Sequence, residues 1–264
     1  MGVKNQSNGS MTVKRNGKRI MASLSNSDTF LPVRLAGNLF FLTAHGINII
    51  IMHLALQSDV MKDKDLVTFK TLQFKYITIW NLAFQNIYLG IYVICDISTL
   101  FKLHEKNKFI VLSKRYRTMI FSSIIWPCSL FIFTLFWPLY LYDRELVFPS
   151  FIDKVLSLMS NHMMHSFIVV VIAWEMMFYP RNKPQTHKWN FINIILVYVL
   201  YYVMMISNYY ITGIWPYPLI YDIYGTIYFP LLMVFTFLLY ISAYFIQWPL
   251  LKCIHGAPRS TNED

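Results

Sequence analysis

The chain has 264 residues, of which 56% are hydrophobic and only 14% are charged. Soluble domains carry about 25% charged residues, so the composition excludes an ordinary soluble protein and predicts one integral membrane domain. The net charge of +10 is divided among separate loops, and this pattern disfavours a nucleic-acid-binding protein, which needs a basic patch. The three cysteines show neither disulfide nor metal spacing.

The first 30 residues are rich in serine, asparagine, lysine and arginine and contain no apolar run. This composition predicts a disordered, basic cytosolic tail over residues 1–30, without a signal-peptide core. The membrane domain is expected to occupy residues 31–252, and a second cytosolic tail is expected over residues 253–264.

Six apolar segments follow the first tail, and each is about 20 residues or longer, which is enough to cross a ~30 Å hydrocarbon core as a helix. They lie near residues 36–57, 76–100, 118–141, 155–178, 190–212 and 224–250. The sequence therefore predicts an all-α polytopic membrane protein, a bundle of six transmembrane helices. In the sixth segment, Pro230 is expected to kink the helix and Pro249 to end it.

Lysine and arginine residues alternate between the regions that connect these segments. The N-terminal tail through Arg34 has six, the second loop six, the fourth loop three and the C-terminal tail two, whereas the first loop has four, the third two and the fifth none. By the positive-inside rule, both termini and the second and fourth loops face the cytosol. The endoplasmic reticulum is the expected membrane, and the plasma membrane is the alternative.

A histidine pair within the fourth segment is the strongest sign of a functional site. Ionisable side chains are costly in hydrocarbon and generally face a partner or a cavity. His162 and His165 lie three residues apart, on one face of a helix. The predicted topology brings Thr78 and Asn81 of the second segment, and Asn208 of the fifth, to the same lumenal half of the bundle. This common depth predicts one polar site within the bilayer.

The chemistry of that site is narrowed by the motifs that the sequence lacks. There is no Gly-x-Ser-x-Gly turn, no phosphate-binding glycine loop and no His-Glu-x-x-His. What remains is a hydroxyl with an imidazole, because a histidine can take the proton of a threonine nucleophile and later protonate the leaving alkoxide. Acyl transfer also needs donors where oxyanion charge develops. The candidates for that role are Asn81, Asn161, His162 and Asn208.

A metal site is the alternative chemistry. His45, His162 and His165 could converge with a carboxylate as zinc ligands, but a pair at i, i+3 is only half a site and no acidic residue lies beside it. We therefore expect neither a metal nor another cofactor.

Several segments resemble a known family, the androgen-induced and androgen-dependent TFPI-regulating multipass membrane proteins. The most specific segments are Phe136-Trp137, Tyr142-Asp143-Arg144-Glu145 and Asn161-His162-x-Met164-His165. Supporting segments are Phe74-Lys75-Tyr76-Ile77-Thr78, Cys95-Asp96-Ile97-Ser98, and Thr212-Gly213-Ile214-Trp215 with Tyr217-Pro218. Together they cover roughly residues 35–250.

The resemblance implies an intramembrane threonine hydrolase, an esterase of lipid metabolism that cleaves fatty acid esters of hydroxy fatty acids without a cofactor. By motif position it implies Thr78 as the nucleophile and His165 as the general base and acid. Apart from the resemblance, Asp143 or another acidic group is a candidate to orient the imidazole. The chain departs from the family at its long basic tail, at Asn208-Tyr209-Tyr210, where some relatives carry histidines, and at Pro216. These departures concern the pocket and leave Thr78 and His165 in place.

Two other functions remain open from the sequence. Polar groups inside membrane helices also mark substrate and ion pathways, so a nonenzymatic transporter, receptor or regulatory partner is the first alternative. A metal-dependent membrane lipid hydrolase is the second. The expected partners are the lipid bilayer and a lipid ester substrate; no nucleic acid is expected, and the sequence does not identify a protein partner.

Overall fold

The computed structural model describes residues 30–58, 63–103 and 107–256. The predicted tail over residues 1–30 lies outside this part of the chain except for its last residue, as do residues 257–264 of the predicted C-terminal tail. All regular secondary structure in the described ranges is helical.

The helices fall into long, short and irregular groups. The long helices are α2 (Leu31–Ala55), α4 (Ile77–Leu100), α6 (Trp126–Asp143), α9 (Lys188–Thr212) and α11 (Tyr228–His255). The shorter ones are α3 (Lys64–Thr71), α5 (Lys108–Ile120), α7 (Leu158–His165), α8 (Phe167–Phe178) and α10 (Pro218–Ile223). One π-helical turn, η3 (Phe121–Ile125), joins α5 to α6, and the 3-10 turns are η2 (Gln73–Lys75), η4 (Arg144–Leu146) and η5 (Ser150–Lys154).

Five helical runs among the described residues are long and apolar enough to cross a membrane. They are α2, α4, α9, α11 and the continuous run Lys108–Leu146, which contains α5, η3 and α6. The fourth predicted segment instead forms two shorter helices, α7 and α8, which meet at Ser166. The all-α polytopic bundle predicted from the sequence is thereby confirmed, with one of its six segments broken into two helices.

The break in the fourth segment has a local cause and a structural consequence. Ser157 starts α7 by accepting a hydrogen bond from the Ser160 N–H, and Ser166, with φ −106° and ψ −49°, ends it. Serine side chains suit such boundaries because they hydrogen-bond the local backbone. His165 is consequently the last residue of α7, at a junction between two helices instead of in the middle of one.

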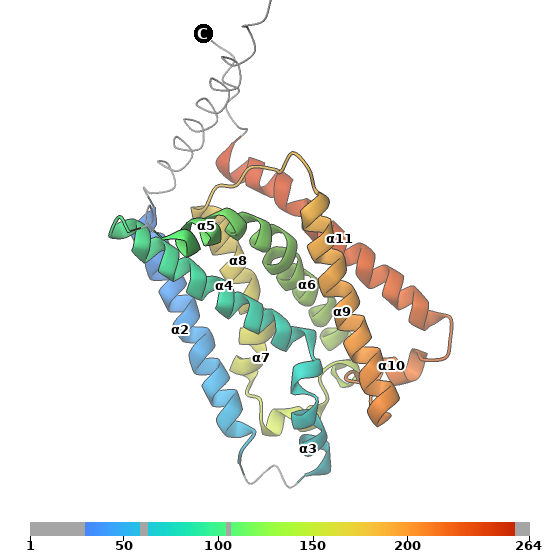
Figure 1. Ribbon diagram of the computed structural model, residues 1–264. Coiled ribbons are helices and arrows are strands. Elements are labelled where there is room, and N and C mark those ends of the chain that lie inside the picture. The colour runs from blue at the N-terminus through green and yellow to red at the C-terminus, as the bar shows by residue number, and fades with distance from the viewer. Residues whose placement is uncertain (1–29, 59–62, 104–106, 257–264) are drawn as a thin grey trace, which may run out of the picture.

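The helices form two packed pairs with α8 between them (Figure 1). α2 packs along α4, α11 packs along α6, and α8 contacts both α2 and α6. At one end of the bundle α3 contacts η5, α10 contacts η4, and η2 leads directly into α4. These short elements therefore cover the end of the bundle at which α4 begins.

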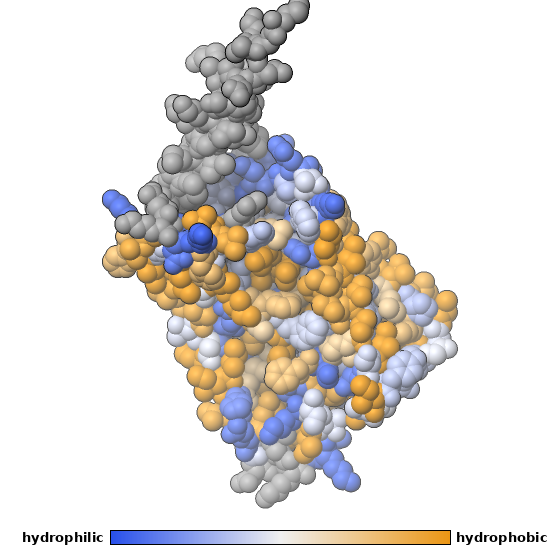
Figure 2. Space-filling view, in the orientation of Figure 1, coloured by the Kyte–Doolittle hydropathy of each residue, from blue (hydrophilic) through white to orange (hydrophobic). Residues whose placement is uncertain are grey.

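The outer surface matches a hydrocarbon environment. Figure 2 shows apolar residues over most of the visible face, with hydrophilic residues concentrated toward the two ends. Large apolar side chains such as Ile50 of α2, Ile87 of α4 and Leu231 of α11 are more than half exposed. A soluble protein rarely exposes so large an apolar patch, whereas lipid chains cover such a surface in a membrane.

The expectation that the last helix ends at Pro249 is wrong. Pro230 lies in the first turn of α11, where its missing N–H removes no intrahelical hydrogen bond. Pro249 lies within α11, which continues to His255 and past the predicted domain boundary at residue 252. The helix continues because Trp248 and Leu251, on either side of this proline, are buried against the bundle.

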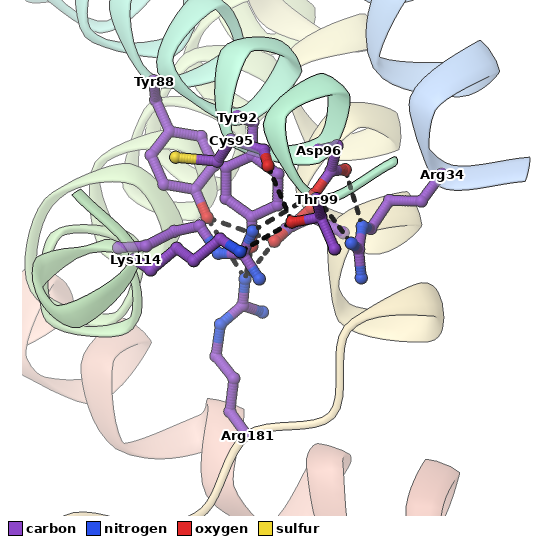
Figure 3. A network of polar contacts seen from close by, with 10 residues as sticks. Arg34, Tyr88, Tyr92, Cys95, Asp96, Thr99, Lys114 and Arg181 are labelled. Atoms are coloured by element: carbon purple, nitrogen blue, oxygen red, sulfur yellow. Dashed lines mark hydrogen bonds and ion pairs between the residues drawn. The ribbon is translucent and has the colours of Figure 1, made fainter. Parts of the chain in front are cut away.

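Buried charged residues join the helices at the end of the bundle where α4 finishes. We call Arg34, Asp96, Arg117, Glu175 and Arg181 the polar clamp, and Figure 3 labels three of them, Arg34, Asp96 and Arg181. Arg34 of α2 binds both carboxylate oxygens of Asp96 on α4, at 2.8 and 2.7 Å. Arg117 of α5 lies 3.5 Å from the same carboxylate. Asp96 is 1% exposed, so this carboxylate joins three helices within the protein interior.

The second half of the polar clamp centres on Arg181, in the segment that follows α8. Its guanidinium pairs with Glu175 of α8 and donates to the hydroxyls of Tyr88 and Tyr92 on α4. The Arg117 guanidinium lies over the Tyr92 ring, 3.8 Å from its centroid. Cations over aromatic faces are stabilised when they are removed from water. The polar clamp therefore connects α2, α4, α5 and α8 through paired charges.

Replacement of Asp96 by asparagine tests the polar clamp. Asp96→Asn leaves Arg34 and Arg117 buried without their carboxylate, and breaking a buried ion pair in this way costs about 3–5 kcal/mol. Asp153→Asn is the matched control, since Asp153 pairs with Arg144 but is 53% exposed, and an exposed pair contributes at most about 1 kcal/mol. Unfolding in detergent should separate the two variants; equal loss would contradict a stabilising role for the polar clamp.

Candidate active site

Thr78 is the second residue of α4 and lies at the end of the bundle opposite the polar clamp. The preceding Tyr76 is extended, with φ −89° and ψ 129°, and its side chain does not cap the helix. The first N–H groups of a helix have no intrahelical acceptor, and their dipoles favour negative charge nearby. Thr78 is thus presented at a helix end that suits a developing anion.

His165 faces this threonine from the last turn of α7. The distance from Thr78 Oγ1 to His165 Nε2 is 3.4 Å, which is long for a hydrogen bond but usual for catalytic pairs before substrate binds. On the other side of the ring, His165 Nδ1 lies 3.0 Å from the backbone carbonyl of Asn161. A carbonyl can only accept, so Nδ1 carries the proton of the neutral imidazole and Nε2 is free to accept one from Thr78.

The orientation of the His165 ring is fixed by stacking. The ring of Phe136 on α6 lies parallel to it, with centroids 3.5 Å apart and planes inclined by 10°. His165 is 5% exposed, so packing and the Asn161 carbonyl together hold the imidazole in one position. Such support from neighbouring groups is what keeps a catalytic side chain in productive geometry.

Thr78 and His165 line one cavity of about 150 Å³. Its walls come from α2, α4, α6, α7, α9, α11 and the covering elements, and most of the lining residues are apolar. Met52, Phe69, Ile132, Leu135 and Met205 are typical. Ligand pockets generally combine such walls with a few placed polar groups, and here the threonine and the histidine are among those groups.

The four predicted oxyanion donors are dispersed, and none lines this cavity. Asn81 is buried on α4, where its Oδ1 accepts a hydrogen bond from Ser129 at 3.1 Å. The Asn161 side-chain Oδ1 is buried without a partner. Asn208, in the last turns of α9, donates to the carbonyl of Ile214, just after the helix ends, at 2.7 Å.

The two histidines of α7 have different surroundings. His162 is exposed, stacks on Trp137 with centroids 5.1 Å apart and contacts Ser166 through Nδ1 at 3.2 Å. His45 of α2 is fully buried against Phe167 and both its ring nitrogens lack partners. Within the described ranges, no three histidine, cysteine or acidic side chains gather as metal ligands would.

The acidic residues of the third loop form their own local contacts. Asp143 accepts a hydrogen bond from the Glu145 N–H, and Glu145 accepts one from the Ser150 N–H. The Nδ1 side of His165 is instead occupied by the Asn161 carbonyl. A backbone carbonyl, and not the Asp143 side chain suggested from the sequence, therefore orients the imidazole.

Two residues near Thr78 were missed by the sequence reasoning. Tyr201 of α9 and Tyr217, just before α10, line the cavity and their hydroxyls are 3.1 Å apart. The Tyr217 hydroxyl also accepts a hydrogen bond from the Ile77 N–H at 3.4 Å. The signal was present for Tyr217, which belongs to one of the segments that carry the family resemblance, but periodicity gave no reason to select Tyr201 among so many tyrosines.

An ion pair outside the membrane-spanning helices joins η5 to the start of α3, at the end of the bundle where α4 begins. Lys154 of η5 donates to Asp63, which precedes α3, at 2.7 Å. This hydrogen bond lowers the pKa of Asp63 below its usual value. Because the folded pKa is depressed, the contact is present above the ordinary aspartate pKa and is lost as the pH falls through the lowered one. Phe69 of α3 and Ile152 of η5 lie behind this pair as cavity walls.

Residues 39–248 match the family described as FAR-17a/AIG1-like protein. The chain belongs to this family. It is 31% identical over 146 residues to the androgen-dependent TFPI-regulating protein of Homo sapiens, and the aligned region covers 55% of this chain and 62% of that protein. The androgen-induced gene 1 protein of Homo sapiens is 26% identical over 149 residues, which covers 54% of this chain and 62% of that protein.

These matches confirm the resemblance inferred from the sequence. Each covers less than two thirds of the relative's own length. No solved structure matches the chain.

The stacking of His165 can be tested without any assay of activity. In a protein with isotope-labelled histidines, the Phe136 ring current should shift the His165 carbon-bound ring protons upfield, and Phe136→Leu should move them downfield. Trp137→Leu is the matched control, because Trp137 stacks on His162 and not on His165. A His165 signal that responds only to Trp137→Leu would contradict the arrangement.

Proposed function

We propose that this protein is an intramembrane threonine hydrolase that cleaves esters between fatty acids and hydroxy fatty acids. The observation that carries the proposal is the contact between Thr78 and His165 inside an apolar cavity, with the histidine tautomer set by the Asn161 carbonyl. Family membership supports the choice of reaction and substrate, because the motifs that resemble the family include both residues.

The first half of the reaction forms an acyl-enzyme. Thr78 Oγ1 attacks the ester carbonyl carbon while its proton passes to His165 Nε2, and the carbonyl oxygen becomes an oxyanion. When the intermediate collapses, the bond to the hydroxy fatty acid oxygen breaks and His165 returns the proton to that oxygen. The hydroxy fatty acid leaves, and the fatty acyl group remains on Thr78.

The second half returns the enzyme to its starting state. Water attacks the acyl carbon as His165 takes one of its protons, and collapse of the second intermediate breaks the bond to Thr78 Oγ1. His165 then gives the proton back to the threonine oxygen, so that one water is consumed and the free fatty acid is released. No metal or redox group is needed for any of these steps.

The cavity suits a lipid ester better than a water-soluble one. A volume of about 150 Å³ holds a group about the size of benzene, so it accommodates the ester and its adjoining carbons. The remaining chain carbons must extend from the cavity toward the surrounding lipid. We place the enzyme with both termini in the cytosol and the reaction in the lumenal half of the membrane, most simply that of the endoplasmic reticulum.

The nonenzymatic alternative and the enzyme make opposite predictions for Thr78. Membranes that contain the wild type should hydrolyse a branched fatty acid ester of a hydroxy fatty acid. Thr78→Ala and His165→Ala should lower this rate by about 10³-fold or more, as removal of a nucleophile or its base does. Thr78→Ser should keep measurable activity because it keeps a hydroxyl. His162→Ala is the matched control and should retain activity, since His162 lies outside the cavity.

Two outcomes would redirect the proposal. Wild-type membranes without activity on esters of several chain lengths would favour the transporter, receptor or regulatory function. Activity that a metal chelator abolishes and added zinc restores would favour the metal-dependent hydrolase. The proposed enzyme should be insensitive to the chelator.

A further inference from the structure

We propose that the hydroxyl of Tyr217 donates the hydrogen bond that stabilises the oxyanion of this reaction, and that Tyr201 holds Tyr217 in position. The inference rests on the proposed function and assigns a role that none of the four donors predicted from the sequence can fill from its observed place. It is carried by the position of the Tyr217 hydroxyl, its hydrogen-bond partners and the cavity that it lines.

The Tyr217 hydroxyl lies at the N-terminus of the helix that bears the nucleophile. Its oxygen is 3.4 Å from the backbone nitrogen of Ile77, the residue next to Thr78. Tyr217, Thr78 and His165 line the same cavity. Tyr217 and the start of α4 therefore border the space that an ester carbonyl must enter to reach Thr78 Oγ1.

Counting protons and lone pairs shows what the Tyr217 hydroxyl can still do. A phenol has one proton to donate and can accept hydrogen bonds at its oxygen. The oxygen accepts from the Ile77 N–H at 3.4 Å and from the Tyr201 O–H at 3.1 Å. The single Tyr201 proton is shared between the Tyr217 oxygen and the Lys75 carbonyl at 3.3 Å, so the Tyr217 proton has no acceptor among the hydrogen bonds of the described residues. The Tyr217 hydroxyl can therefore donate a hydrogen bond to a bound oxyanion, as an oxyanion site requires.

Tyr201 and Tyr76 keep this donor in place. The Tyr201 hydroxyl also lies 3.3 Å from the Lys75 carbonyl, which connects α9 to the start of α4. The Tyr76 ring packs edge-on against the Tyr217 ring, with centroids 5.5 Å apart and planes at 74°. A donor held in this way loses little freedom when charge develops, which is the basis of electrostatic preorganisation.

Most other hydroxyls of the cavity are bound elsewhere or lie on other elements, and Tyr76, at the start of α4, is the exception. Tyr202 contacts Thr236 at 2.7 Å, and Tyr198 contacts the same hydroxyl at 3.1 Å. The Tyr240 hydroxyl is buried without a partner, but its ring packs against Phe131 of α6 and not against the start of α4. Tyr76, which lines the cavity and whose hydroxyl makes no hydrogen bond within the described ranges, and Tyr240 are accordingly the competing donors that an experiment must distinguish from Tyr217.

The first test compares single hydroxyl deletions in ester hydrolysis by membranes with matched protein levels. Tyr217→Phe should lower kcat by about 10²–10³-fold, the effect of removing one oxyanion donor, with KM changed less than about twofold because the donor acts mainly in the transition state. Tyr201→Phe should lower kcat by a smaller factor. Tyr228→Phe is the matched control and should match the wild type, since Tyr228 is 65% exposed and lies outside the cavity.

The outcomes separate this inference from the proposed function. If the wild type is active, Thr78→Ala is inactive and Tyr217→Phe keeps full kcat, the donor assignment is wrong while the hydrolase stands. Loss in Tyr76→Phe or Tyr240→Phe in place of Tyr217→Phe would overturn it in the same way. A wild type without activity removes the proposed function itself.

A second measurement covers the case in which Tyr217→Phe does not fold. Fluorinated tyrosine incorporated at position 217 retains the ring but ionises at lower pH, and an ionised phenol cannot donate. The alkaline limb of the kcat profile should then move to lower pH in the fluorinated protein and not in one fluorinated at position 228. An unmoved limb would overturn the role of the Tyr217 proton.

Discussion

A polar side chain inside a membrane bundle is costly unless it has a partner, and in this protein α4 carries such side chains along one buried face. Asn81, Gln85, Tyr88, Tyr92 and Asp96 are all buried and follow one another at helical spacing. Thr78 begins the series at one end of the helix, and the polar clamp completes it at the other. The remaining helices are arranged so that this face meets its partners.

The middle of that face shows how closely the partners are placed. Gln85 donates to Ser129 of α6 at 2.8 Å and to the Ile168 carbonyl of α8 at 3.0 Å, and Ser129 in turn donates to Asn81. These contacts pull α6 and α8 against α4 in the same register that brings Phe136 and His165 to Thr78. The geometry of the candidate site therefore depends on how the polar face of α4 is satisfied, since α6 supplies both Ser129 and Phe136, and α8 directly follows the helix α7 that carries His165.

Much of this arrangement could be predicted from the sequence, and the failures have physical causes. Length and hydropathy located the membrane segments because a hydrocarbon core demands long apolar helices. The same reasoning did not predict the break at Ser166, since a continuous apolar run says nothing about a local serine boundary. Asp96 and Arg34 could be recognised as charges near helix ends, but their pairing depends on the packing of α2 against α4.

The candidate site shows the same limit. The residues Thr78 and His165 could be selected from the sequence because the family motifs include them. The partner of His165 Nδ1 could not, because it is a backbone carbonyl that every residue possesses. Tyr201 was equally hidden, and the resemblance that includes Tyr217 did not indicate its position, since only the fold brings α9 and the segment before α10 to the start of α4.

The measurement that tests the central claim most directly is identification of the residue that becomes acylated. The wild type in membranes is mixed with an excess of the ester, stopped with acid within one turnover and digested, and the peptides are analysed by mass spectrometry. We expect a fatty acyl group on the peptide that contains Thr78, with attachment at the threonine oxygen, and no such group in His165→Ala. Hydrolysis that proceeds with no acyl group on Thr78, or with one on another residue, would contradict the central claim.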